Sequence, residues 1–95
     1  MYARVVRFTD VTQERIDQIV SRIEDADGPP PGVKSSGIKL FYDKEQATAI
    51  FVGEFDSEQD LRDSEDVLQQ MDAAETPGTR ASIDRCEMVV EAHRD

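Results

Sequence analysis

Ser64 and Asp60 are the polar residues whose type and spacing best suit the binding of a small molecule. They lie four residues apart in a segment whose apolar residues repeat with helical spacing, so both fall on one side of the expected helix. A hydroxyl and a carboxylate at the edge of an apolar cleft could orient a polar group of a ligand. The alternative, which the pattern favours, is that Ser64 lets the helix approach a sheet closely and donates a hydrogen bond to the Asp60 carbonyl oxygen.

Three aromatic residues are candidates for the opposite side of this cleft. Tyr42, Phe51 and Phe55 lie in the segments 36–43 and 47–55, on one face of the expected hairpin. An apolar site with few polar groups suits an aromatic or quinone-type ligand. Tyr42 could orient a phenolic ligand, although such a tyrosine is more often a packing residue with one end in water.

The other reactive side chains form no recognisable site. The acidic residues of segment 56–66 are expected to form a solvated helix face rather than a metal site. Cys86 is expected to point into the core as a small hydrophobic residue. His93 alone provides neither a catalytic dyad nor a metal site. We therefore predict no metal and no bound cofactor.

The overall charge argues against two classes of partner. With 21 acidic and 11 basic residues, the chain carries a net charge of −10. Nucleic acids and anionic membranes attract proteins mainly through Lys and Arg, so neither is expected as a partner. No apolar run approaches the roughly 18 residues of a membrane span. The single cysteine excludes an internal disulfide and favours a cytoplasmic location.

Six segments show the patterns of regular structure, in the order strand, helix, strand, strand, helix, strand. The expected strands are 2–8, 36–43, 47–55 and 82–92, and the expected helices are 9–28 and 56–75. The apolar stripe of the first helix is Ile16, Ile19, Val20 and Ile23, and that of the second is Leu61, Val67, Leu68 and Met71.

The ends of both helices carry capping signals. Asp10 or Thr12 could accept hydrogen bonds at the start of the first helix. Gly28 is expected to end that helix, because three prolines follow it. Asp56 with Gln59 resembles a capping box at the start of the second helix.

This order of elements predicts a ferredoxin-like α+β domain that spans residues 1–95. Each strand–helix–strand crossover is expected to be right-handed, and two such crossovers interleave to give a four-stranded antiparallel sheet. The first and third strands then lie at the centre of the sheet, and both helices cover the same face. A chain of 95 residues supplies one modest core.

The second face of this sheet is expected to need cover. If Lys44–Glu45 is a two-residue turn, Leu40 faces Ala49, and side chains alternate between the two faces from there. The face without helices then carries Phe41, Ile50 and Val52.

The outer strands extend this apolar surface. The first strand would add Val5 or Val6, and the fourth would add Met88 or Val89. A patch of that size exceeds what a soluble monomer usually exposes. We therefore predict a homodimer in which two copies pack these faces together about a two-fold axis.

Two stretches of the sequence resemble a known superfamily. "FDSEQDLRDSE" (55–65) and "PPGVKSSGIKLFYDKE" (30–45) are similar to passages in uncharacterised members of the dimeric α+β barrel superfamily, which contains the antibiotic-biosynthesis monooxygenase-like domains. The resemblance implies a homodimer whose sheets form a barrel, with ligands in the cleft between helices and sheet. Its members range from cofactor-free quinol oxygenases to haem-degrading enzymes, isomerases and proteins of no known activity. The cofactor-free oxygenases use Asn, Trp and His in the cleft, whereas this chain has no Asn or Trp and one His.

Two functions are consistent with these features. The first is a small-molecule binding protein, or a cofactor-independent monooxygenase-like enzyme, acting on an aromatic or quinone-type ligand in the cleft between the second helix and the sheet. The alternative is a non-catalytic dimerisation or regulatory domain. An open cleft would favour the first function, and a cleft filled by side chains would favour the second.

Overall fold

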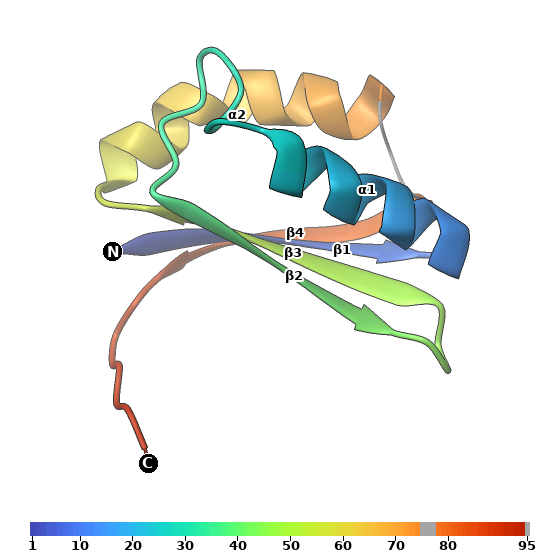
Figure 1. The fold of residues 1–95 in the computed structure, drawn as a ribbon. Helices are drawn as coiled ribbons and strands as arrows, with labels where there is room; N and C mark the ends of the chain where they lie inside the picture. Colours follow the sequence, from blue (N-terminus) through green and yellow to red (C-terminus); the bar gives the residue numbers. More distant parts are fainter. Residues whose placement is uncertain (75–77, 95) are drawn as a thin grey trace.

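The computed structural model describes residues 1–74 and 78–94, apart from the side chains of residues 71–74. Its elements are β1 (Tyr2–Thr9), α1 (Gln13–Asp25), β2 (Gly37–Asp43), β3 (Thr48–Phe55), α2 (Glu58–Ala74) and β4 (Thr79–Glu87). The strands form one antiparallel sheet in the order β2-β3-β1-β4, and both helices cover the same face of it (Figure 1). The prediction of a ferredoxin-like α+β fold is confirmed.

Helix α1 is capped by Thr12, one of the two predicted capping residues, and it is shorter at both ends than the predicted segment 9–28. Thr12 is the N-cap, and its hydroxyl accepts a hydrogen bond from the backbone N–H of Arg15 at 3.2 Å. The helix ends at Asp25, where the Ala26 N–H donates to the Ile23 carbonyl oxygen at 3.3 Å and the backbone becomes extended. The prediction that Gly28 caps this end is wrong, because the helix stops without a left-handed residue.

Helix α2 is capped by Ser57, not by the predicted pair of Asp56 and Gln59. Strand β3 runs to Phe55 and the helix begins at Glu58, so Ser57 occupies the cap position. Its hydroxyl accepts from the Asp60 N–H at 3.1 Å, while Gln59 donates to Asp63 instead. Along the predicted stripe, Leu61 is buried and Val67 and Leu68 are partly buried, whereas the side chain of Met71 lies outside the described part.

The β2–β3 hairpin has a longer turn than the sequence suggested. The last pair is Asp43 with Thr48, so Leu40 faces Phe51 rather than Ala49. The Asp43 carboxylate accepts hydrogen bonds from the backbone N–H groups of Glu45 and Gln46, which stabilises a wider turn. Because the register differs by two residues, every side chain stays on its predicted face.

We call the sheet face opposite the helices the open face. Pairing and alternation place Val5, Phe41, Ile50 and Val52 on it. Val6 points the other way and is only 1% exposed. Phe41 is 54% exposed, so this apolar surface is uncovered in the single chain.

Strand β4 ends sooner than predicted and contributes polar residues to the open face. It stops at Glu87, opposite Tyr2, and the Met88 N–H makes a last hydrogen bond to the Met1 carbonyl oxygen. Met88 and Val89 therefore lie beyond the sheet, in a segment that extends away from it (Figure 1). Cys86 is exposed rather than buried, because alternation along this edge strand turns it away from the helices.

The core between helices and sheet consists of two separate clusters. Buried residues of the first are Val6, Phe8, Val11, Ile16 and Ala49, and those of the second are Val33, Phe55 and Leu61. The rings of Phe8 and Phe51 meet edge to face with centroids 5.5 Å apart. Residues of both clusters line the cavity described below.

Candidate functional site

A cavity of about 600 Å³ lies between α1, the segment 26–37 and the helix-covered face of the sheet. Its walls are mostly apolar, with Ile19 and Ile23 from α1, Phe51 and Phe55 from β3, and Leu68 from α2. Volumes of about 300–1,000 Å³ with apolar walls are typical of small-molecule sites. The cavity is therefore the best candidate for a binding site in the described part of the chain.

The segment 26–37 forms one wall of the cavity because it is fixed at several points. Val33 is buried against Phe55 and Leu61, and its N–H donates to the Pro30 carbonyl oxygen at 3.0 Å. The Ser36 N–H donates to a β3 carbonyl oxygen, that of Glu54, at 2.8 Å.

Gly32 allows this wall to approach α2 closely. Its φ is +85°, a conformation that residues with a side chain rarely adopt. A Cβ atom at this position would also lie 3.0 Å from Cγ2 of Val67. The sequence therefore needs glycine where the segment passes over the helix.

The polar side chains that line the cavity come from two arginines and two serines. Arg4 projects from the centre of β1 and is 4% exposed, whereas Arg22 lies in the last turn of α1 and is exposed. Ser35 and Ser36 belong to the segment 26–37. No Asp or Glu is among the described residues that line it.

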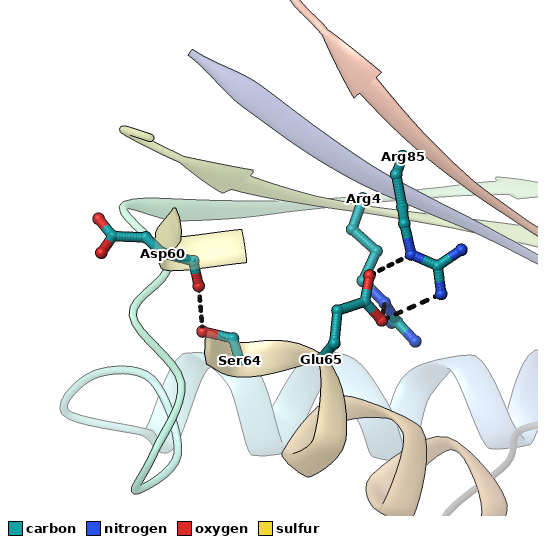
Figure 2. A network of polar contacts seen from close by, with 5 residues as sticks. All are labelled: Arg4, Asp60, Ser64, Glu65 and Arg85. Atoms are coloured by element: carbon teal, nitrogen blue, oxygen red, sulfur yellow. Dashed lines mark hydrogen bonds and ion pairs between the residues drawn. The ribbon is translucent and has the colours of Figure 1, made fainter. Parts of the chain in front are cut away.

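Arg4 is held in place by Glu65 of α2, which also contacts Arg85 of β4 (Figure 2). The Glu65 Oε2 atom lies 3.3 Å from Arg4 Nε and 3.2 Å from Arg85 Nη2, and its Oε1 atom accepts from Arg85 Nε. Burial by itself would raise the pKa of Glu65. The hydrogen bonds and charges of the two guanidinium groups outweigh that effect and lower the pKa, so the carboxylate is ionised at neutral pH.

Ser64 and Asp60 do not line this cavity. The Ser64 side chain is 0% exposed, and its hydroxyl donates to the Asp60 carbonyl oxygen at 2.8 Å, as the structural alternative predicted. The same hydroxyl accepts from the Lys34 N–H at 2.8 Å. The carboxylate of Asp60 points away from Ser64 (Figure 2). Ser64 is thus a buried packing residue, and its hydroxyl contacts the segment 26–37 rather than the cavity.

The three predicted aromatic residues separate into two groups. Phe51 and Phe55 line the cavity, and Phe55 is fully buried. Tyr42 packs against the first core cluster, and its hydroxyl donates to the Val11 carbonyl oxygen at 2.7 Å. Tyr42 is therefore a packing residue that anchors the loop before α1.

The sequence reasoning missed Arg4 and Arg22. A signal for Arg4 was present, because it lies between Tyr2 and Val6 on the side of β1 that faces the helices. A charged residue in such a row has to find a partner or a ligand. Arg22 gave no signal, since an arginine near the end of a helix is common on protein surfaces.

A second, smaller hollow of about 330 Å³ lies between α2 and the β1–β4 edge of the sheet. It is lined by Tyr2, Leu61 and the charged side chains of Glu58, Arg62, Glu65, Arg85 and Glu87. Glu58 and Arg62 pair with each other along the helix. This hollow is more polar than the first and lies on the outer side of the Glu65 cluster.

Metal-ligating side chains and membrane-spanning helices can be assessed for the described ranges 1–74 and 78–94. These ranges contain no group of three or more His, Cys, Asp or Glu side chains that could hold a metal ion. None of their helices is long and apolar enough to span a membrane.

Comparison with known proteins identifies the fold and no closer relationship. No protein-family model matches the chain, and no curated protein matches it. Among solved structures, the chain is similar to a proposed antibiotic biosynthesis monooxygenase from Chloroflexus aurantiacus J-10-fl, with a TM-score of 0.61 and 13% identity. The match covers 97% of this chain and 96% of that one. At this identity the likeness shows that the two proteins share a fold, the one that the sequence resemblance implied.

Proposed function

We propose that this protein binds a small apolar or aromatic molecule in the cavity between α1, the segment 26–37 and the sheet. The observation that supports this most directly is the cavity itself, with a volume of about 600 Å³ and mostly apolar walls. Phe51 lines the cavity and is only partly buried, so its ring can contact an aromatic ligand. Ser64 would act indirectly, by fixing the wall segment through the Lys34 N–H.

The reaction we propose for this site is a cofactor-independent oxygenation of a quinol-type ring. The neighbour that shares this fold is described as a proposed antibiotic biosynthesis monooxygenase, which is what suggests this class of reaction. In such a reaction the substrate itself supplies the electrons that reduce O₂, which an electron-rich aromatic ring can do. The protein's part would be to hold the ring in an apolar space from which water is excluded.

A pair of tryptophan substitutions on α1 tests the location of the site. Ile23 lines the cavity, whereas Val20 on the same helix is 37% exposed and does not. We expect 2-naphthol to shift the methyl resonances of Ile19, Ile23 and Val33 in the unmodified protein. Ile23→Trp should abolish these shifts by filling the space, and Val20→Trp should retain them.

The activity is tested separately from binding. An oxygen electrode would record O₂ consumption with 1,4-dihydroxynaphthalene above the uncatalysed background, with Val20→Trp active and Ile23→Trp inactive. Binding without consumption would leave a binding protein. Shifts confined to Ile50 and Val52 on the open face would contradict the cavity as the site.

The open face supports a homodimer and, with it, the second candidate function. Phe41 with Val5, Ile50 and Val52 forms an apolar surface that a second copy of the same sheet would cover. The solid packing around Ser64 is also what a non-catalytic dimerisation or regulatory domain would have. If Ile23→Trp abolishes ligand binding but leaves the molar mass in solution unchanged, ligand binding and dimerisation are independent of each other.

A further inference from the structure

Gly53 forms part of the cavity wall within one of the two central strands of the sheet. It belongs to β3 and pairs with Arg4 of β1 on one side and with Ile38 of β2 on the other. It lines the cavity and is partly exposed. Glycine inside a strand destabilises the strand relative to alanine, and it often marks a place where a ligand or another backbone approaches closely.

Neither the backbone conformation nor the strand pairing requires glycine at this position. The φ angle of Gly53 lies outside the left-handed region, unlike that of Gly32. The pairing of β3 with both of its neighbours runs through Gly53 without a register shift, so there is no bulge here. Gly53 therefore has the conformation of an ordinary strand residue.

Packing within the protein does not require glycine either. A Cβ atom on Gly53 would lie 3.4 Å from Cε2 and 3.8 Å from Cζ of Phe55, and 4.0 Å from the Arg4 carbonyl oxygen. These are ordinary van der Waals distances, so a methyl group would fit. Because Phe55 belongs to the helix-covered face, this methyl group would project on the cavity side of the sheet.

The missing side chain leaves a depression in the cavity wall. Phe51 and Phe55 lie two residues away from Gly53 on either side, on the same face of β3. Phe51 is partly buried and can contact a ligand, whereas Phe55 is fully buried and closes the other side. The floor of the depression is the flat peptide backbone of β3. A planar ring can lie on such a floor, whereas a saturated ring carries axial hydrogens on both of its faces and needs more room.

We infer that the ligand of this cavity is a planar ring system that lies against the backbone of Gly53, and that Gly53 determines which ligand shapes the site accepts. This rests on the proposed function, since it concerns the same cavity. A methyl group at position 53 would then overlap the ligand while fitting into the protein without one. The glycine costs stability in the strand, and the close approach of the ligand accounts for it.

The test compares Gly53→Ala with Gly37→Ala as its matched control. The backbone of Gly37 borders the cavity, but a Cβ atom there would lie 3.4 Å from the Glu54 carboxylate, on the open face. The two variants thus add the same group on opposite sides of the sheet. We expect Gly53→Ala to weaken the binding of 2-naphthol about tenfold or more, the effect of overfilling a close contact, and Gly37→Ala to retain it. Gly53→Ala should melt at the same temperature as the unmodified protein or higher.

Two measurements on the unmodified protein test the contact without any variant. 2-Naphthol should bind about tenfold more tightly than decahydro-2-naphthol, which has the same carbon skeleton in saturated form. Burial of apolar surface alone would favour the saturated compound, so the expected order reports shape. The ring protons of bound 2-naphthol should also show nuclear Overhauser effects to the Hα protons of Gly53.

The outcomes separate this inference from the proposed function. Suppose that 2-naphthol shifts the methyl resonances of Ile19, Ile23 and Val33. If it then binds both glycine variants equally, shows no Overhauser effect to Gly53 or binds no more tightly than the saturated compound, the inference is wrong and the cavity remains the binding site. A large fall in the melting temperature of Gly53→Ala would show that the glycine serves packing, and it would also contradict the inference. If 2-naphthol shifts none of these resonances, both the inference and the proposed site are wrong.

Discussion

A single hydroxyl, that of Ser64, joins helix α2 to the wall of the cavity. It donates to the Asp60 carbonyl oxygen within the helix and accepts from the Lys34 N–H of the wall segment, both at 2.8 Å. The nearby ion pair between Lys34 and Asp63 joins the same two elements at the surface, where both side chains are more than a third exposed. Buried and exposed contacts between the same elements can therefore be compared directly.

We expect Ser64→Ala to lower the free energy of unfolding by about 1–3 kcal/mol, because the Lys34 N–H loses its acceptor, the fully buried Ser64 hydroxyl. Binding of 2-naphthol in the cavity should weaken as the wall segment loosens. Asp63→Asn is the control, and it should change both quantities little, since exposed ion pairs contribute little. Urea unfolding and methyl titrations measure the two effects. Equal effects of the two variants would contradict a special role for the buried hydroxyl.

The ion cluster around Glu65 predicts a dependence of stability on acid pH. The pKa of Glu65 is lowered from its usual 4.5, so its contribution is fully present above that value and is lost as pH falls through the folded-state pKa. Glu65→Gln should thus be less stable than the unmodified protein at pH 7, and the difference should shrink as the pH falls below 4.5. The melting temperatures of the two proteins at pH 3 to 7 measure this.

Other carboxylates titrate in the same range, which makes the difference between the two proteins the useful quantity. The pKa of Asp43 is lowered mainly by hydrogen bonds from Gln46, and the pKa of Asp63 is lowered mainly by a hydrogen bond from Lys34. Both groups are present in the unmodified protein and in Glu65→Gln, so their contributions cancel. A difference in melting temperature that stays constant with pH would show that Glu65 gains nothing from its charge.

At the scale of the elements, the parts decided by local patterns could be predicted, and the parts decided by distant partners could not. Which side chains of the β2–β3 hairpin share a face could be predicted, because a register shift of an even number of residues leaves every side chain on the same face. The length of the turn could not be predicted, because it depends on the hydrogen bonds of the Asp43 carboxylate. Strand β4 pairs with β1 as far as Glu87, which lies opposite Tyr2, so its end depends on a partner that lies far away in the chain.

The candidate site shows the same division. Phe51 and Phe55 were predictable from the hairpin, because they lie on its buried face. The cavity depends on the path of the segment 26–37 and on its contacts with α2, which lie about 30 positions away in the chain, as with Lys34 and Ser64. No local pattern records such a path. Arg4 was visible as a charge in a buried row, but its meaning depends on Glu65 and the cavity.

Two glycines of the segment 26–37 provide a test at this scale. Gly32 has a φ of +85°, and a Cβ atom added to it would lie 3.0 Å from Val67 Cγ2, whereas one added to Gly28 would have no atom within 4 Å. We expect Gly32→Ala to destabilise the protein by about 1 kcal/mol or more, and Gly28→Ala to be neutral or to stabilise it by up to about 1 kcal/mol. Denaturant unfolding measures both. A neutral Gly32→Ala would mean that the segment does not need this conformation.

At the scale of the whole molecule, the open face is an apolar surface that the single chain leaves uncovered. Its centre is apolar and its edges carry charge, such as the pair of Lys39 and Glu54. Such a pattern, apolar inside and polar at the rim, is typical of protein interfaces. The face lies opposite the cavity, so the expected dimer contact and the proposed binding site are on separate surfaces of the sheet.

We expect the protein to form a two-fold dimer that buries about 800 Å² per subunit, a usual size for a stable interface. Light scattering should give twice the chain mass of 10.7 kDa at micromolar concentration. Ile50→Asp should dissociate or unfold the dimer, because it would bury a charge without a partner. Val20→Asp, at an exposed site on α1, should leave the mass unchanged. A monomer in the unmodified protein would contradict the expectation.

The hydrogen bonds that hold the segment 26–37 affect which of its residues can change during evolution. In its C-terminal half, Lys34 is hydrogen-bonded to α2 and Ser36 to β3. Pro29 and Pro30 line the cavity, are exposed, and precede these hydrogen-bonded residues. Substitutions at these two positions would change the shape of the cavity and leave the sheet and the open face unchanged. Proteins descended from one ancestral chain could therefore come to differ in the shape of this cavity through substitutions in one short stretch, while keeping the same sheet and the same open face.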